Sequence, residues 1–258
     1  MQNDKPIGLF DSGIGGTSIW REIRQLLPNE DTIYLADSKN APYGMRPKQE
    51  IVALSEKNVD FLLDRDCKLI VVACNTATTN AIQELRQQYK VPFIGIEPAI
   101  KPAALKSKTN SIGVLATKGT LSSELFSKAV ETFQDTNIIE QVGYNLVALI
   151  EGGQMESEEM TRLLNQYLQP MIEANIDHLV LGCSHYPYLI PQIRKILPEN
   201  VQIIDSGSAV ARQTQHLLKM VTGTAEKRIG TSTFFTNSDP TVLSKILGSG
   251  YPVERVDF

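Results

Sequence analysis

Two stretches of sequence decide the fold, Leu69-Ile70-Val71-Val72-Ala73-Cys74 and His178-Leu179-Val180-Leu181-Gly182-Cys183. Each is a short apolar run of the kind that forms a fully buried strand of a parallel sheet, and each ends in a small residue and a cysteine. Polar residues follow directly, Asn75-Thr76 after the first run and Ser184-His185 after the second. Because the two cysteines lie 109 residues apart, at positions 74 and 183, the pattern indicates a chain built from two similar halves.

Other segments repeat at nearly the same interval. Ile7-Gly8-Leu9-Phe10 resembles Ile112-Gly113-Val114-Leu115, which begins 105 positions later, and residues 91–96 resemble the segment from residue 201. Apolar positions at helical spacing separate these runs, and strands that alternate with helices are typical of βαβ units and a parallel sheet. The predicted fold class is therefore α/β, with two pseudo-symmetric open α/β domains whose sheets are mainly parallel.

The apolar patterns also predict the individual elements. Expected strands occupy residues 7–10, 32–36, 69–73, 92–96, 112–115, 179–182, 201–204 and 231–236. Expected helices fall within residues 19–27, 51–63, 81–89, 121–133, 160–172, 189–197, 208–221 and 242–247. Ligands bind at the carboxyl ends of the strands in open α/β sheets, so two facing halves would place Cys74 and Cys183 on one cleft.

Length and composition set limits on the function. The 258 residues are enough for one large or two small domains, and 42% apolar with 21% charged residues is ordinary globular usage. A net charge of −4 without a basic tract argues against a nucleic-acid partner. No apolar run approaches the ~20 residues of a membrane span, and the N-terminal residues show no signal region. We therefore expect a cytoplasmic protein with no membrane partner; for its assembly, a homodimer is one option.

The cysteines indicate chemistry rather than cross-linking. Three cysteines in such a chain argue against a disulfide framework, and the three cysteines and three histidines have no metal-binding spacing, so no metal site is expected. Cys67 is read as structural. Cys74 and Cys183 are each expected at the start of a helix, where the dipole and free N–H groups would lower the pKa of a thiol. One acid or base on each face of a carbon is the minimum for inverting a stereocentre by proton transfer.

The glycine-rich loop Asp11-Ser12-Gly13-Ile14-Gly15-Gly16 supports a rival interpretation. It lies between an expected strand and helix, and Asp37 ends the next strand, as in a dinucleotide-binding fingerprint. However, Ser18 replaces the third glycine, and Asp11 would repel a pyrophosphate. Two function classes stay open at this point: a cofactor-free isomerase, and a ligand-binding or nucleotide-dependent protein whose cysteines are structural.

Five motifs carry a family resemblance: residues 10–16, Pro42-Tyr43-Gly44, residues 73–78, Ile96-Glu97-Pro98 and residues 183–187. Together, in this order and over nearly the whole chain, they resemble the glutamate racemases of the aspartate/glutamate racemase family. The resemblance implies cofactor-independent interconversion of L- and D-glutamate, which supplies D-glutamate for peptidoglycan. It also implies one domain from residues 1–98 plus 208–258, a second from residues 99–207, and an active site in the cleft between them.

The resemblance further implies a role for each matching residue. Cys74 would take the α-proton from D-glutamate while Cys183 delivers one to the opposite face, with the roles exchanged for L-glutamate. The implied assisting groups are Asp11 and His185, with Glu151 as a third acid. Because Asp11 lies on the loop that opens the first half and His185 lies two residues after Cys183, we expect Asp11 to serve Cys74 and His185 to serve Cys183. The implied substrate contacts are Asp11, Ser12, Tyr43, Gly44, Asn75, Thr76, Ser184 and His185, with Thr117 and Thr120 as further carboxylate ligands.

Two points remain open within this resemblance. The family usually has threonine where this chain has Ser184, which keeps the hydroxyl and loses a methyl group. An aspartate racemase or a related cofactor-free isomerase is the alternative to a glutamate racemase. Taken singly, Asp11 can also be read as a helix cap, His185 as a structural histidine and Glu151 as a solvated helix end.

Overall fold

The structure, a computed structural model, describes residues 4–221 and 229–258, so the first three residues of the chain lie outside it. The strands are β1 (Ile7–Asp11), β2 (Thr32–Ala36), β3 (Leu69–Val72), β4 (Phe93–Gly95), β5 (Ser111–Ala116), β6 (Asn137–Val142), β7 (His178–Gly182), β8 (Gln202–Ile204), β9 (Ser232–Thr236) and β10 (Val253–Arg255). The helices are α1 (Thr17–Leu26), α2 (Lys48–Leu63), α3 (Asn75–Gln88), α4 (Ile100–Lys106), α5 (Lys118–Leu121), α6 (Glu124–Glu131), α7 (Leu146–Glu151), α8 (Glu158–Glu173), α9 (Ile190–Ile196), α10 (Gly207–Val221) and α11 (Thr241–Leu247).

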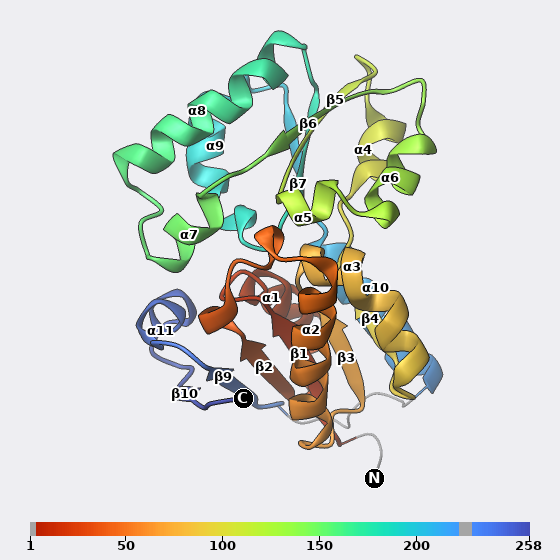
Figure 1. The fold of residues 1–258 in the computed structure, drawn as a ribbon, viewed down its shortest axis with the longest axis vertical. Helices are drawn as coiled ribbons and strands as arrows, with labels where there is room; N and C mark the ends of the chain where they lie inside the picture. The colour runs from red at the N-terminus through yellow and green to blue at the C-terminus, as the bar shows by residue number, and fades with distance from the viewer. Residues whose placement is uncertain (1–3, 222–228) are drawn as a thin grey trace.

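Two parallel sheets form the framework, one in each lobe of the molecule (Figure 1). The strand order is β10-β9-β2-β1-β3-β4 in the first sheet and β6-β5-β7-β8 in the second. The order β2-β1-β3-β4 of the first sheet therefore recurs as β6-β5-β7-β8 in the second, as the internal repeat predicts. Helices flank both sheets, and the predicted α/β fold class is confirmed.

Some strands and helices of the structure were not predicted from the sequence. β6 is the partner of β5 at the edge of the second sheet, and its residues are only partly buried, so it has no continuous apolar run. The short elements β10, α4 and α7 also lack a pattern long enough to be detected. Among the described residues, no helix combines the length and the apolar character that a membrane span requires.

The chain passes between the lobes twice, once after β4 and once after β8. The two crossings touch, because the hydroxyl of Ser206 donates to the carbonyl of Glu97. After the second crossing, α10 packs against α1 of the first lobe, and β9 then joins the first sheet beside β2. The predicted domain boundaries at residues 98 and 207 stay a prediction.

One apolar cluster extends through both lobes. It joins Ile14 and Ile19 near the start of α1 with Leu146 and Ile150 of α7, and it continues to Leu179 of β7. Burying apolar surface between the lobes holds the carboxyl ends of both sheets close to each other. Those ends carry the loops with the predicted site residues.

We predict that Leu179→Ala destabilises the protein by about 2–5 kcal/mol, because it removes a fully buried side chain from the centre of the second sheet. Leu105→Ala is the matched control, since 69% of the surface of Leu105 is exposed, and its effect should stay within about 0.5 kcal/mol. Chemical denaturation of both variants measures the free energy of unfolding, and equal losses would contradict the central placement of Leu179.

Candidate active site

The loops after four strands meet at one small cavity, here called the thiol cavity. Cys74 follows β3, Thr117 follows β5 and Cys183 follows β7, while Ser12 follows β1. The cavity has about 230 Å³ of empty space and is lined by Ser12, Pro42, Tyr43, Gly44, Cys74, Asn75, Thr76, Thr117, Val147, Cys183, Ser184 and His185. Both thiols that were predicted to face one cleft therefore line it.

Cys74 caps the N-terminus of α3. Its Sγ accepts a hydrogen bond from the backbone N–H of Ala77 at 3.5 Å and lies 3.6 Å from the hydroxyl of Ser12. The prediction of a lowered pKa for this thiol is wrong. Burial raises the pKa of Cys74 well above its ordinary value, the negative charge of Asp11 raises it further, and the helix N-terminus offsets only part of this.

Cys183 has different surroundings. It was expected at the start of an α-helix, but it lies in a turn, and a 3₁₀ segment over Tyr186–Leu189 precedes α9. Pro187 lies inside this segment and cannot supply the backbone N–H that an α-helix needs. The Sγ of Cys183 instead lies 3.8 Å from Nδ1 of His185. An imidazolium at that position stabilises the sulfur when the sulfur carries a negative charge.

His185 lies between two carboxylates. Its Nε2 is 2.6 Å from Oε1 of Glu151, and its Nδ1 is 4.0 Å from Oδ2 of Asp11. Burial alone would lower the pKa of His185. The hydrogen bonds to Cys183 and Glu151, with the charge of Asp11, outweigh burial and hold its pKa well above the usual range. These surroundings favour the protonated form of the ring.

Asp11 organises the glycine-rich loop from inside. Its Oδ2 accepts the backbone N–H groups of Gly13 and Gly16, at 3.2 and 3.0 Å, and its Oδ1 accepts the hydroxyl of Ser184 at 3.1 Å. Burial raises the pKa of Asp11, and the positive charge of His185 opposes this. The predicted pairing of Asp11 with Cys74 is not a hydrogen bond here: Asp11 bonds to Ser184 of the opposite lobe, and Ser12 contacts Cys74.

Glu151 enters the loop from the second lobe. Its Oε1 accepts the backbone N–H of Ile14 at 2.7 Å in addition to the bond from His185, and its Oε2 accepts the hydroxyl of Ser38 at 3.1 Å. A Cβ on Gly13 would lie 1.8 Å from Oε1 of Glu151, so a side chain there would displace the Glu151 carboxylate from the loop. Asp11 and Glu151 together occupy the backbone N–H groups of Gly13, Ile14 and Gly16. These groups are therefore not free to bind a phosphate, which argues against the dinucleotide-binding interpretation.

Three threonine hydroxyls join the lobes on the other side of the cavity. Thr76 of α3 lies 2.8 Å from Thr117, which lies 3.0 Å from Thr120. Beside them, Asn75 is 2% exposed, and neither polar atom of its amide has a hydrogen-bond partner among the described residues. A buried amide without partners is costly, and a ligand with carboxylate and ammonium groups would satisfy it.

Tyr43 is held in the wall of the cavity by polar neighbours. Its hydroxyl donates to Asp37 at the end of β2 and accepts from the amide of Asn58 at 3.0 Å. Asp37 also accepts from the amides of Asn40 and Asn237. In the sequence, Asp37 counted only as part of the rival dinucleotide-binding fingerprint, whereas in the structure it orients Tyr43.

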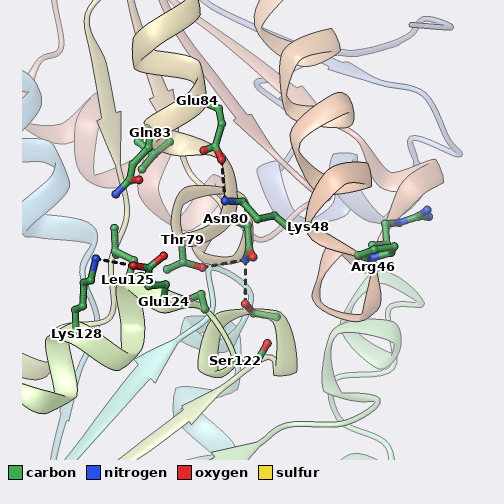
Figure 2. A pocket seen from close by; sticks show the side chains of 14 residues that line it. Arg46, Lys48, Thr79, Asn80, Gln83, Glu84, Ser122, Glu124, Leu125 and Lys128 are labelled. Carbon is green, nitrogen blue, oxygen red and sulfur yellow. Dashed lines mark hydrogen bonds and ion pairs between the residues drawn. The ribbon is translucent and has the colours of Figure 1, made fainter.

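A wider pocket lies beside the thiol cavity, with about 1030 Å³ of empty space between α2 and α3 of one lobe and α5 and α6 of the other (Figure 2). Its lysines are already paired within their own lobes, Lys48 with Glu84 at 2.7 Å and Lys128 with Glu124 at 2.6 Å. Asn80 forms part of its wall and donates to the carbonyl of Gly119 across the lobes at 2.9 Å. No cysteine reaches this pocket, so it is not the candidate active site.

The predicted site residues divide into two groups. Those lining the cavity are Ser12, Tyr43, Gly44, Cys74, Asn75, Thr76, Thr117, Cys183, Ser184 and His185. Asp11, Thr120 and Glu151 lie behind the lining and bond to its members. Pro42 and Val147 line the cavity without having been predicted, and their apolar side chains carried no chemical signal in the sequence.

The comparison with known proteins agrees with this geometry. The family model of the Asp/Glu/hydantoin racemases matches residues 7–214. The chain belongs to this family. A glutamate racemase of Herpetosiphon aurantiacus is 45% identical over 245 residues, which cover 94% of this chain and 96% of that protein. A glutamate racemase of Ralstonia pickettii is 42% identical over 257 residues, covering 98% and 91% of the two chains.

Solved structures show the same architecture. A glutamate racemase isoform from Bacillus anthracis superposes with a TM-score of 0.89 at 31% identity, covering 99% of this chain and 98% of that one. The Escherichia coli glutamate racemase, solved in complex with L-glutamate and an activator, gives 0.86 at 32% identity, with 98% of each chain covered. The resemblance to glutamate racemases and the predicted enzyme class, an amino-acid racemase, are thereby confirmed.

We predict that Glu151→Gln lowers the pKa of His185, because the ring loses the carboxylate that stabilises its protonated form. Titration of the histidine ring signals by NMR measures the shift. An unchanged or raised midpoint for His185 would contradict the charge cluster described above.

Proposed function

We propose that this chain interconverts L- and D-glutamate without a cofactor, by proton transfer between its two buried thiols. The observation that carries the proposal is that Cys74 and Cys183 come from equivalent strands of the two lobes and line the same cavity. Thiols that approach an α-carbon from two lobes reach its opposite faces, which is what inversion requires.

The reaction balances with the two thiols alone. In the direction from D- to L-glutamate, the thiolate of Cys74 removes the α-proton, and the thiol of Cys183 delivers its proton to the opposite face. The enzyme then holds a neutral Cys74 and an anionic Cys183, which is the form that accepts L-glutamate. His185 stabilises the anionic form of Cys183 through the contact at 3.8 Å.

Cys74 must lose its proton despite the raised pKa. A substrate brings an α-ammonium group into the cavity, and a positive charge nearby favours the thiolate. The Ser12 hydroxyl and the Ala77 N–H then support that charge. Exclusion of water by the buried walls strengthens each of these interactions.

The lining of the cavity suits a small zwitterion. It offers the hydroxyls of Ser12, Thr76, Thr117 and Ser184 and the unpaired amide of Asn75. Hydroxyls and amide N–H groups bind carboxylates by donating hydrogen bonds. Relatives at 41–47% identity that are named glutamate racemases support glutamate over aspartate as the substrate.

The proposed setting follows from the product. D-Glutamate would serve peptidoglycan synthesis, and the cytoplasm stays the compartment expected from the sequence. A homodimer remains an expectation from the sequence alone.

We predict that Cys74→Ser and Cys183→Ser each lower racemisation of glutamate by at least about 10²-fold, because inversion needs both groups. Cys67→Ser is the matched control and should stay near the wild-type rate, since Cys67 packs beside Gly8 away from the cavity. Optical rotation measures the rate on protein freed of small molecules, and near-normal racemisation by either active-site variant would contradict the two-thiol mechanism.

Deuterium oxide provides a second prediction. Thiol protons exchange with water, so the product enantiomer formed early should carry deuterium at the α-carbon, whereas the recovered substrate should carry much less. Equal early labelling of both enantiomers would indicate a single base. Parallel assays with aspartate decide the alternative, because faster turnover of aspartate than of glutamate would replace the proposed substrate.

A further inference from the structure

Two hydroxyl groups outside the thiol cavity connect the lobes beside His185. The hydroxyl of Thr17, the first residue of α1, lies 2.5 Å from the hydroxyl of Tyr188 in the 3₁₀ segment after His185. Thr17 is fully buried, and neither residue lines the cavity. This contact therefore belongs to neither the substrate ligands nor the thiols.

The direction of this hydrogen bond can be assigned. Thr17 donates its single hydroxyl proton to the carbonyl of Ile14 at 2.6 Å, so its oxygen accepts the proton of Tyr188. The backbone N–H of the same Ile14 is bound by Glu151, which also holds His185. The hydrogen bonds thus run from Tyr188 through Thr17, Ile14 and Glu151 to His185, and the backbone N–H of Tyr188 closes the ring by donating to the carbonyl of His185 at 3.2 Å.

A neighbouring contact fixes the other end of the same turn. The hydroxyl of Ser18 lies 3.0 Å from the carbonyl oxygen of Ser184 and 2.9 Å from that of Gly15. The turn that carries Cys183 and His185 is thus anchored to the start of α1 at two points. A Cβ on Gly15 would lie 2.3 Å from Nδ1 of His185, so the loop and the ring are already in close contact.

We infer that Thr17 and Tyr188 are positioning residues for racemisation, which hold the imidazole of His185 against Cys183 and Glu151. The inference rests on the proposed function, because it assigns the two hydroxyls a role in proton transfer at Cys183. Without the bond, the turn after β7 keeps only one of its two contacts with the start of α1, the one made by Ser18. The ring of His185 then loses its fixed approach to Cys183, while the cavity residues of the first lobe, such as Ser12, Asn75 and Thr76, stay in place.

The variants Tyr188→Phe and Thr17→Val test this role, since each removes one partner and keeps the size of the side chain. The Phe variant also keeps the ring that faces Arg21, whose guanidinium carbon lies 5.8 Å from the ring centroid. We expect kcat from L- to D-glutamate to fall about five- to tenfold, the range expected for one hydrogen bond, with KM changed less than twofold. The double variant should lose no more than either single one, because both act on the same bond.

Matched controls separate positioning from general damage. Tyr167→Phe removes a hydroxyl contact within the second lobe, and Thr214→Val removes one within α10. Both should keep the wild-type kcat. Thr17→Ser retains the hydroxyl, so its kcat should be close to that of the wild type and above that of Thr17→Val. A fall in kcat of equal size in the controls, or none in Tyr188→Phe, would overturn the inference.

A measurement without substrate separates this inference from the proposed function. Loosening the turn weakens the contact between His185 and Glu151, so the NMR titration midpoint of His185 should fall in Tyr188→Phe and in Thr17→Val but not in Tyr167→Phe. If the wild-type protein fails to racemise glutamate, the proposed function fails, and this titration still decides the positioning role. An unchanged His185 midpoint in both variants would overturn it.

Discussion

The rest of the site depends on one interaction, in which the buried imidazole of His185 is held between the carboxylates of Asp11 and Glu151. Charges removed from water are stable only when they are paired, and these three come from three distant parts of the chain. The lobes must therefore meet closely, and the loop after β1 must admit both partners from the second lobe. Glycines at positions 13 and 15 leave room for these partners, because a side chain at Gly13 would collide with Glu151 and one at Gly15 would collide with His185.

Much of this architecture is readable from the sequence because it is encoded locally. A strand buried on both faces is a continuous apolar run, so β1, β3, β5 and β7 could be located, and their repetition indicated two halves. The rule that ligands bind at the carboxyl ends of parallel strands then brought Cys74 and Cys183 to one cavity. The residues that follow these strands line the cavity for the same reason.

The rest depends on contacts that no local pattern contains. Glu151 ends a short helix and was open to reading as a solvated residue, yet its oxygens bind Ile14 and Ser38 more than 110 positions away. The pKa of Cys74 was misjudged because the helix N-terminus is visible in the sequence, whereas the burial that outweighs it is not. β6 was missed because an edge strand needs no apolar run once its neighbour β5 is in place.

The two sides of the thiol cavity are held together by unequal forces. On one side, neutral groups join the lobes through Thr76 with Thr117 and Asn80 with Gly119, bonds worth about 0.5–1.5 kcal/mol each. On the other side, the charged cluster around His185 is buried and costly to separate. Cys74 and Cys183 are only 4% and 6% exposed, so both thiols are shielded from solvent between these two sides. Breaking the contacts on the side with neutral hydroxyls therefore costs less than separating the charged cluster of Asp11, His185 and Glu151.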